Sequence, residues 1–117
     1  MKKRYFLRAC KNDGTSYGEF KWDLTIGAVN TSPDWNSDPV CGGGLHGLEN
    51  GVGDSSLLGF SEDSIFVVFS ATADIVTFAG KSKVKNAKIE YVGELSSCAE
   101  FLYKKTNYIY WLIYRVK

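Results

Sequence analysis

Apolar and polar side chains alternate with a period of two along several short stretches of this chain. Alternation of this kind is typical of β-strands that have one face on a core and one in water. Residues 64–72 differ, because they are apolar at nearly every position, which indicates a central strand covered on both faces. The sequence predicts strands over residues 4–10, 17–24, 64–72, 74–78 and 83–92, the last with a shift near Asn86.

One stretch near the C-terminus has the spacing of a helix instead. Ser96 and Ser97 are good capping residues for a helix over residues 98–105, in which Ala99 and Leu102 are placed to pack inward. Residues 107–117 are rich in β-branched and aromatic side chains, and this composition favours one more strand, covered on both faces.

The middle of the chain has no regular period. Residues 27–39 hold both prolines together with Asp and Ser, which predicts a loop, and nine of the twelve glycines fall between residues 27 and 80. The expected fold is therefore α+β and mostly β. We expect one domain over residues 1–117, with about six strands in a twisted, largely antiparallel sheet, one short helix near the C-terminus and a long irregular glycine-rich middle segment.

Composition excludes two classes of protein. Hydrophobic residues make up 44% of the chain, which is enough for a core and argues against disorder. No apolar run approaches the roughly 18 residues of a membrane helix, so we expect no membrane partner. Cys10, Cys41 and Cys98 are odd in number and widely spaced, which favours reduced thiols and a cytoplasmic location.

Charge is unevenly distributed although the net charge is only +1. Residues 22–80 contain eight acidic residues and no Lys or Arg, so this middle segment carries −8 and the flanks carry +9. Either the fold interleaves the two, or the middle segment forms an acidic surface for a basic partner. The residues predicted to contact such a partner are Asp34, Trp35, Asp38, Glu49, Asp54, Glu62 and Asp63.

Residues 41–47, CGGGLHG, hold the only histidine of the chain and carry its most specific candidate chemistry. Their G-x-G-x-x-G pattern lacks the preceding strand and following helix that phosphate binding needs. Cys41 and His46 supply only two of the four ligands of a structural zinc, so we expect no metal and no cofactor. The favoured interpretation is a tight turn in which Cys41 packs inward and His46 bonds to backbone; thiol catalysis by Cys41 and His46 is the alternative.

The chain also resembles small uncharacterised proteins of phages and other mobile elements. The resemblance spans about residues 8–94 and rests on short motifs: Arg8-Ala9-Cys10, C-G-x-G-L-H-G at residues 41–47, the apolar strand at 65–69, D-I-V at 74–76, K-V-K at 83–85 and Y-V-G-E at 91–94. It implies a genomic context, that of a phage-encoded accessory protein in the cytoplasm of a bacterial host, and no particular mechanism.

A weaker similarity runs to ADP-ribosyltransferase-like folds, in which a first-strand Arg and a later G-L-H strand border a nicotinamide pocket. Arg8 and residues 44–46 match those places, and the catalytic glutamate would be Glu90 or Glu94. The similarity implies NAD as cofactor for this enzymatic alternative. A surface position for Arg8 is the competing interpretation.

Three functions remain open from the sequence. The favoured one is protein binding by the acidic segment, as an anti-CRISPR-like inhibitor that occupies the basic groove of a bacterial defence complex. The second is an ADP-ribosyltransferase-like or thiol enzyme with Cys41, His46 and Arg8 as catalytic residues. The third is nucleic-acid binding through the basic flanks, whose cationic residues are Lys2, Lys3, Arg4, Lys81, Lys83, Lys85 and Lys88.

Overall fold

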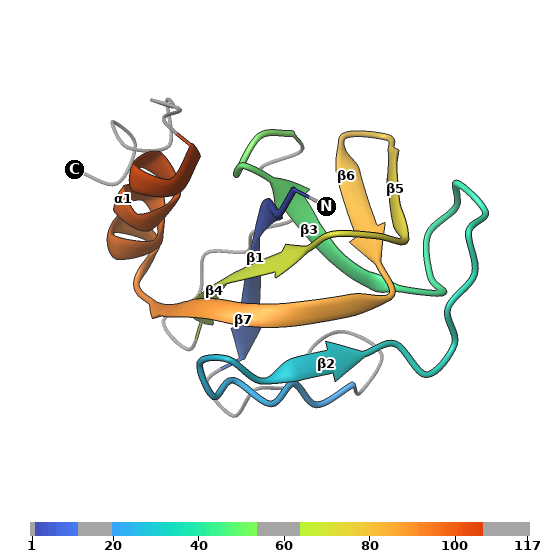
Figure 1. Cartoon of the computed structure of the whole chain (residues 1–117), viewed down its shortest axis with the longest axis horizontal. Helices are drawn as coiled ribbons and strands as arrows, with labels where there is room; N and C mark the ends of the chain where they lie inside the picture. Colours follow the sequence, from blue (N-terminus) through green and yellow to red (C-terminus); the bar gives the residue numbers. More distant parts are fainter. Residues whose placement is uncertain (1, 12–19, 54–63, 107–117) are drawn as a thin grey trace.

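The computed structural model describes residues 2–11, 20–53 and 64–106 as seven strands and one helix. In chain order they are β1 (Arg4–Lys11), β2 (Val29–Thr31), β3 (Leu45–Glu49), β4 (Ser64–Ala71), β5 (Ile75–Phe78), β6 (Lys81–Val84), β7 (Asn86–Gly93) and α1 (Leu95–Thr106). The strands form one antiparallel sheet in the order β2-β7-β4-β1-β3-β6-β5, and α1 lies at the opposite end of the molecule from β5 and β6 (Figure 1). The predicted class, α+β and mostly β, is confirmed.

The centre of the sheet is the pair formed by β1 and β4. The two strands are in register over eight residues, from Arg4 opposite Ala71 to Lys11 opposite Ser64. Side chains of β1 and β4 contribute to a separate apolar cluster on each face of the sheet. On one face, Leu7 and Val68 pack with Cys98 and Leu102 of α1, and none of these four side chains is exposed to solvent.

The other face carries the second apolar cluster. Phe6 stacks on Phe69 with their ring centroids 5.1 Å apart, and Trp22 covers the Phe69 ring at 5.6 Å. Burial of large aromatic side chains is among the strongest contributions to a core of this size. Trp22 is thus a core residue, with 3% of its surface exposed.

The strand order settles how the acidic middle and the basic flanks are arranged. Reading across the sheet, strands from residues 22–80 alternate with strands from the flanks at every position. The sheet therefore brings acidic and basic segments together, as in the ion pair between Arg4 on β1 and Glu49 on β3. Because every flank strand lies between two middle strands, the middle segment does not form a single acidic sheet face.

The structure corrects several predicted boundaries. β2 and β3 lie inside the stretches predicted to be irregular, and the single strand expected over residues 83–92 is two strands, β6 and β7, which lie in different parts of the sheet. Of the strand expected over residues 17–24, the described part, residues 20–24, holds one isolated bridge residue only. The strand expected over residues 107–117 lies outside the described residues.

The helix was predicted correctly but begins earlier than expected. α1 begins at Leu95, and Ser96 and Ser97 lie within its first turn instead of capping it. The backbone carbonyl of Glu94 accepts a hydrogen bond from the Cys98 amide at 3.0 Å and one from the Ser97 hydroxyl at 3.0 Å. No helix within residues 2–11, 20–53 and 64–106 is long and apolar enough to cross a membrane.

Candidate functional site

The loop between β2 and β3, residues 32–44, is held by a lysine that is completely buried. We call these residues the anchored loop. The Lys83 ammonium, from β6, donates to Asn36 Oδ1 at 3.0 Å, to the Val40 carbonyl at 3.2 Å and to the Gly42 carbonyl at 3.0 Å. A backbone bond from Asn36 N–H to the Gly43 carbonyl, at 2.9 Å, closes the loop on itself. The loop centre contains no strand or helix, so its shape is fixed by its contacts to Lys83 together with hydrogen bonds within the loop.

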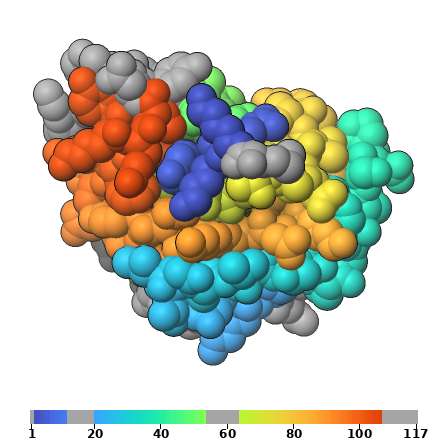
Figure 2. Space-filling view, in the orientation of Figure 1, coloured from blue at the N-terminus to red at the C-terminus, as the bar shows by residue number. Residues whose placement is uncertain are grey.

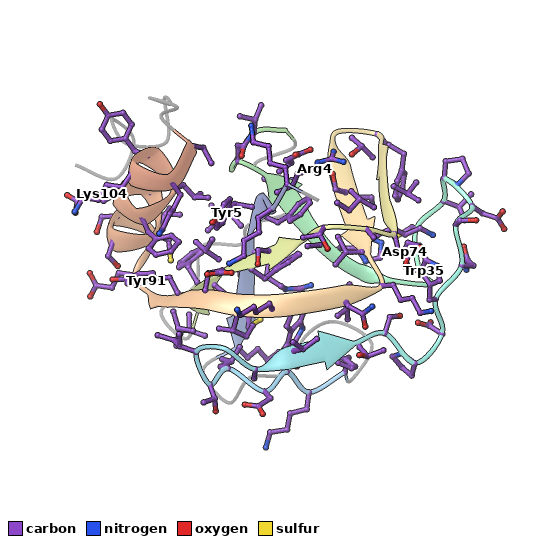
Figure 3. All side chains as sticks on the ribbon, in the orientation of Figure 1. Arg4, Tyr5, Trp35, Asp74, Tyr91 and Lys104 are labelled. Carbon is purple, nitrogen blue, oxygen red and sulfur yellow. The ribbon has the colours of Figure 1, made fainter. Side chains whose placement is uncertain are left out.

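Two aromatic rings complete the surroundings of this ammonium group. The Lys83 nitrogen lies 5.7 Å from the centre of the Trp35 ring and 5.9 Å from that of Phe78 on β5. Cation–π attraction is strongest where water is excluded, as it is here. Figure 3 shows Trp35 on the anchored loop, beside the ends of β5 and β6.

One glycine of the CGGGLHG segment, Gly44, packs directly on this lysine. A Cβ atom at Gly44 would lie 3.0 Å from Lys83 Cβ and Cδ, a tight contact that glycine avoids. Gly43 has a φ of +64°, a conformation that glycine adopts without strain. The prediction of a structural turn is confirmed for Gly42 and Gly43, both of which have positive φ. Lys83 lies about 40 residues away in sequence and is brought onto the loop by the pairing of β3 with β6.

His46 lies next to this anchor, directly opposite Lys83 in the β3–β6 pair. Its ring packs edge-on against Phe78, with 6.3 Å between ring centroids. Burial, together with the charges of Lys81, Arg8 and Lys83 and against an opposite effect of Asp34, lowers the pKa of His46 to about 4. The imidazole is therefore neutral near pH 7. The expected bond from its side chain to backbone is not found for Nε2, which is buried with no hydrogen-bond partner.

This pKa shift makes stability depend on pH in a defined direction. An unfolded His46 takes up a proton near pH 6.5, whereas the folded protein resists protonation down to about pH 4, so folding loses stability as pH falls through that window. Because the ring is partly exposed, we expect a loss of only about 1–2 kcal/mol. Urea unfolding of the wild type and of His46→Gln at pH 7 and pH 4 measures it: the wild type should lose more stability.

The carboxylates titrate in both proteins of that comparison, including Glu90, whose pKa is lowered mainly by its bonds to Ser70 and Lys3 against the opposing effect of burial. The difference between the two proteins therefore isolates His46. An equal loss of stability in both would contradict the neutral, desolvated imidazole described above.

Cys41 is exposed on the anchored loop, so the expectation that it packs inward is wrong. The sequence places acidic residues around it, but its contact in space is the Lys81 ammonium, 3.4 Å from Cys41 Sγ. Cys10 and Cys98 are buried, and burial raises the pKa of both thiols, that of Cys98 to about 12. Among the described residues, no three side chains of His, Cys, Asp or Glu form a metal-binding group.

The candidate acidic contacts do not lie together. Asp34 and Asp38 are exposed on the anchored loop, where Trp35 is partly buried. Glu49 lies at the other end of β3, and both of its oxygens accept hydrogen bonds of 2.7 Å from Arg4. Asp54, Glu62 and Asp63 lie outside the described residues. The part of the predicted surface that the structure keeps together is therefore the anchored loop (Figure 2).

The residues named for the two alternatives are also dispersed. Arg8 points to the face of the sheet that holds Trp22. Glu90 bonds to Ser70 on the other face. That face is identified by Tyr5, the residue opposite Ser70 on β1, which packs toward α1. The sheet thus separates Arg8 from Glu90, the first of the two glutamates named for a nicotinamide pocket. Glu94, the second, is exposed just before α1.

Three of the cations named for the basic flanks are engaged within the fold. Lys83 is buried, Arg4 pairs with Glu49, and Lys3 pairs with Glu90 at 3.1 Å. Lys85 and Lys88 are exposed. A nucleic-acid interface needs exposed cations grouped on one surface to meet phosphates. The nucleic-acid alternative therefore depends on the exposed lysines and stays a prediction.

A family model described as a domain of unknown function, DUF7666, matches residues 5–104. The chain belongs to this family. The matched region begins in β1 and ends within α1, so it includes the anchored loop, Lys83 and both apolar clusters. No curated protein and no solved structure matches the chain.

Proposed function

We propose that this domain acts by binding a partner protein through the anchored loop. The observation that supports this is the complete burial of Lys83 beneath a surface loop that it holds with three hydrogen bonds. A loop that is already ordered loses little conformational entropy when it binds, so its contacts contribute more fully to affinity. Loops on a rigid scaffold are also where binding residues concentrate.

The side chains that the loop presents indicate the chemistry of the partner. Asp34 and Asp38 are exposed, and Val40 is 53% exposed beside them. This combination of an apolar contact with two carboxylates suits a basic surface with an apolar centre. The resemblance to phage and mobile-element proteins makes the nucleic-acid groove of a bacterial defence complex the partner that we propose, with the domain as its inhibitor.

A charge reversal on the loop tests this function. In a pull-down from bacterial lysate, the double variant Asp34→Lys/Asp38→Lys should lose a partner that the wild type retains, by at least about tenfold, because attraction to a basic surface becomes repulsion. The identified partner should then be inhibited by the wild type and not by the variant. Urea unfolding of both proteins shows whether the fold is intact.

The matched control is Glu94→Lys/Glu100→Lys, which changes the net charge by the same amount as the loop double variant. Glu94 directly precedes α1 and Glu100 lies within it, at the far end of the molecule from the loop (Figure 1). This control should bind as the wild type does. Equal losses in both double variants would mean that net charge alone matters, and would refute the loop as the binding surface. If Cys41→Ser abolished the activity instead, thiol chemistry at the Cys41–Lys81 pair would be favoured over binding.

A further inference from the structure

The face of the sheet opposite α1 carries a cation that lacks a counter-ion among the described residues. Arg8, on β1, is partly buried, and its Nη1 donates to the His46 carbonyl at 2.9 Å while its Nε lies 3.2 Å from the Ala9 carbonyl. Both acceptors are neutral, and the Arg8 side chain also interacts with the Cys10 thiol. No carboxylate of residues 2–11, 20–53 or 64–106 contacts the guanidinium. A guanidinium has five N–H donors, so donors remain after its contacts within the described residues.

Arg4, four residues earlier on β1, forms a complete ion pair with a carboxylate and serves as a comparison for Arg8. Arg4 binds Glu49 through Nε and Nη2 with both distances at 2.7 Å, the fork geometry that matches a carboxylate. Arg8 has no such partner in the described chain, although burial lowers the pKa of its guanidinium and so makes its charge more costly to hold than in water.

A second donor without an acceptor lies against Arg8. The Trp22 ring is 5.0 Å from the Arg8 guanidinium carbon, and the indole Nε1 is buried with no hydrogen-bond partner. Only 3% of Trp22 is exposed, and its ring is held edge-on by Phe20 at 5.7 Å. Leaving a buried N–H without an acceptor costs about 1–3 kcal/mol, so such groups are rare in proteins.

We propose that Arg8 and Trp22 form a binding site for a small oxyanion, a phosphate or carboxylate group of a ligand. The charge and the remaining N–H groups of Arg8 bind two oxygens side by side, and the Trp22 N–H donates to the same group. One anion then supplies the acceptor and the negative charge that the two side chains lack among the described residues. Arg8 is partly exposed whereas Trp22 Nε1 is buried, so the anion approaches from solvent through Arg8, on the face away from α1.

Indole N–H signals in a nitrogen-15 NMR spectrum test the proposal. Inorganic phosphate should shift the Trp22 indole signal in a saturable way at constant ionic strength, while the Trp35 indole, which packs on Lys83, should not move. Trp→Phe variants assign the two signals. A parallel titration with glutarate distinguishes a phosphate site from a carboxylate site, because the better ligand saturates at lower concentration.

Two variants separate binding from folding. Trp22→Phe keeps an aromatic ring in the core but removes the N–H, and should weaken anion binding about tenfold, as judged by anion-dependent thermal stabilisation. Arg8→Met should abolish it. The matched control Trp35→Phe should bind the anion as the wild type does. The proposal is overturned if neither anion shifts the Trp22 signal, or if Arg8→Met retains the full stabilisation.

Discussion

Lys83→Met should cost the protein about 3 kcal/mol of stability, more than the loss of any other lysine in the described chain. The ammonium satisfies Asn36 Oδ1 and the Val40 and Gly42 carbonyls, and hydrogen bonds from a charged donor contribute about 1.5–3 kcal/mol each. Methionine fills the same space and removes the cost of burying a charge, which offsets part of that sum. The net loss is measured by urea unfolding.

Lys88→Met is the matched control, because Lys88 is an exposed residue of β7. It should change stability by less than about 0.5 kcal/mol. Hydrogen exchange adds a local readout: in Lys83→Met the Asn36 amide, which bonds to Gly43, should exchange faster than amides of β1. If Lys83→Met were as stable as Lys88→Met, the lysine would not hold the anchored loop, and the proposed binding surface would lose its main support.

Gly47→Ala should destabilise the protein by about 3 kcal/mol, through crowding of the core instead of backbone strain. A Cβ atom at Gly47 would lie 2.8 Å from two atoms of the Phe69 ring and 3.2 Å from the Leu7 carbonyl. Phe69 is fully buried between Phe6 and Trp22 and has no room to retreat. Thermal or urea unfolding measures the loss.

Gly42→Ala is the control that separates steric crowding from the backbone cost of replacing a glycine at positive φ. Nothing lies within 4 Å of a Cβ atom at Gly42, whose φ is +90°, so this change carries only the backbone cost of about 1–2 kcal/mol. Gly42→Ala should therefore be the more stable variant. The opposite order would contradict the close contact between β3 and the Phe69 ring.

Loss of the anchor and loss of the loop charges should also be distinguishable in function. Lys83→Met should weaken partner binding by letting the loop move, so the effect should be smaller at low temperature, where the loop is more ordered. Asp34→Lys/Asp38→Lys removes the contacts themselves and should weaken binding at any temperature. The anion site at Arg8 and Trp22 lies on different side chains and should respond to neither change.

The local pattern of apolar and polar residues was sufficient to predict those strands and the helix in which that pattern has a clear period. β1, β4 and α1 follow from runs of apolar residues with a clear period. β2 and β3 were missed for a physical reason. Both are short, and β3 includes Gly47, so the partner strands and not the intrinsic preference of their own residues decide that they are extended.

The sequence by itself determined the fold class and the glycine-dependent turn in the CGGGLHG segment. The tertiary structure alone decided what that segment is for, because the cation beneath it comes from β6 and reaches it only when β3 and β6 pair. It also decided the charge pattern, since antiparallel pairing places each basic flank strand between two strands of the acidic middle. Contacts between residues distant in sequence are set by strand order, and no local period of apolar residues encodes that order.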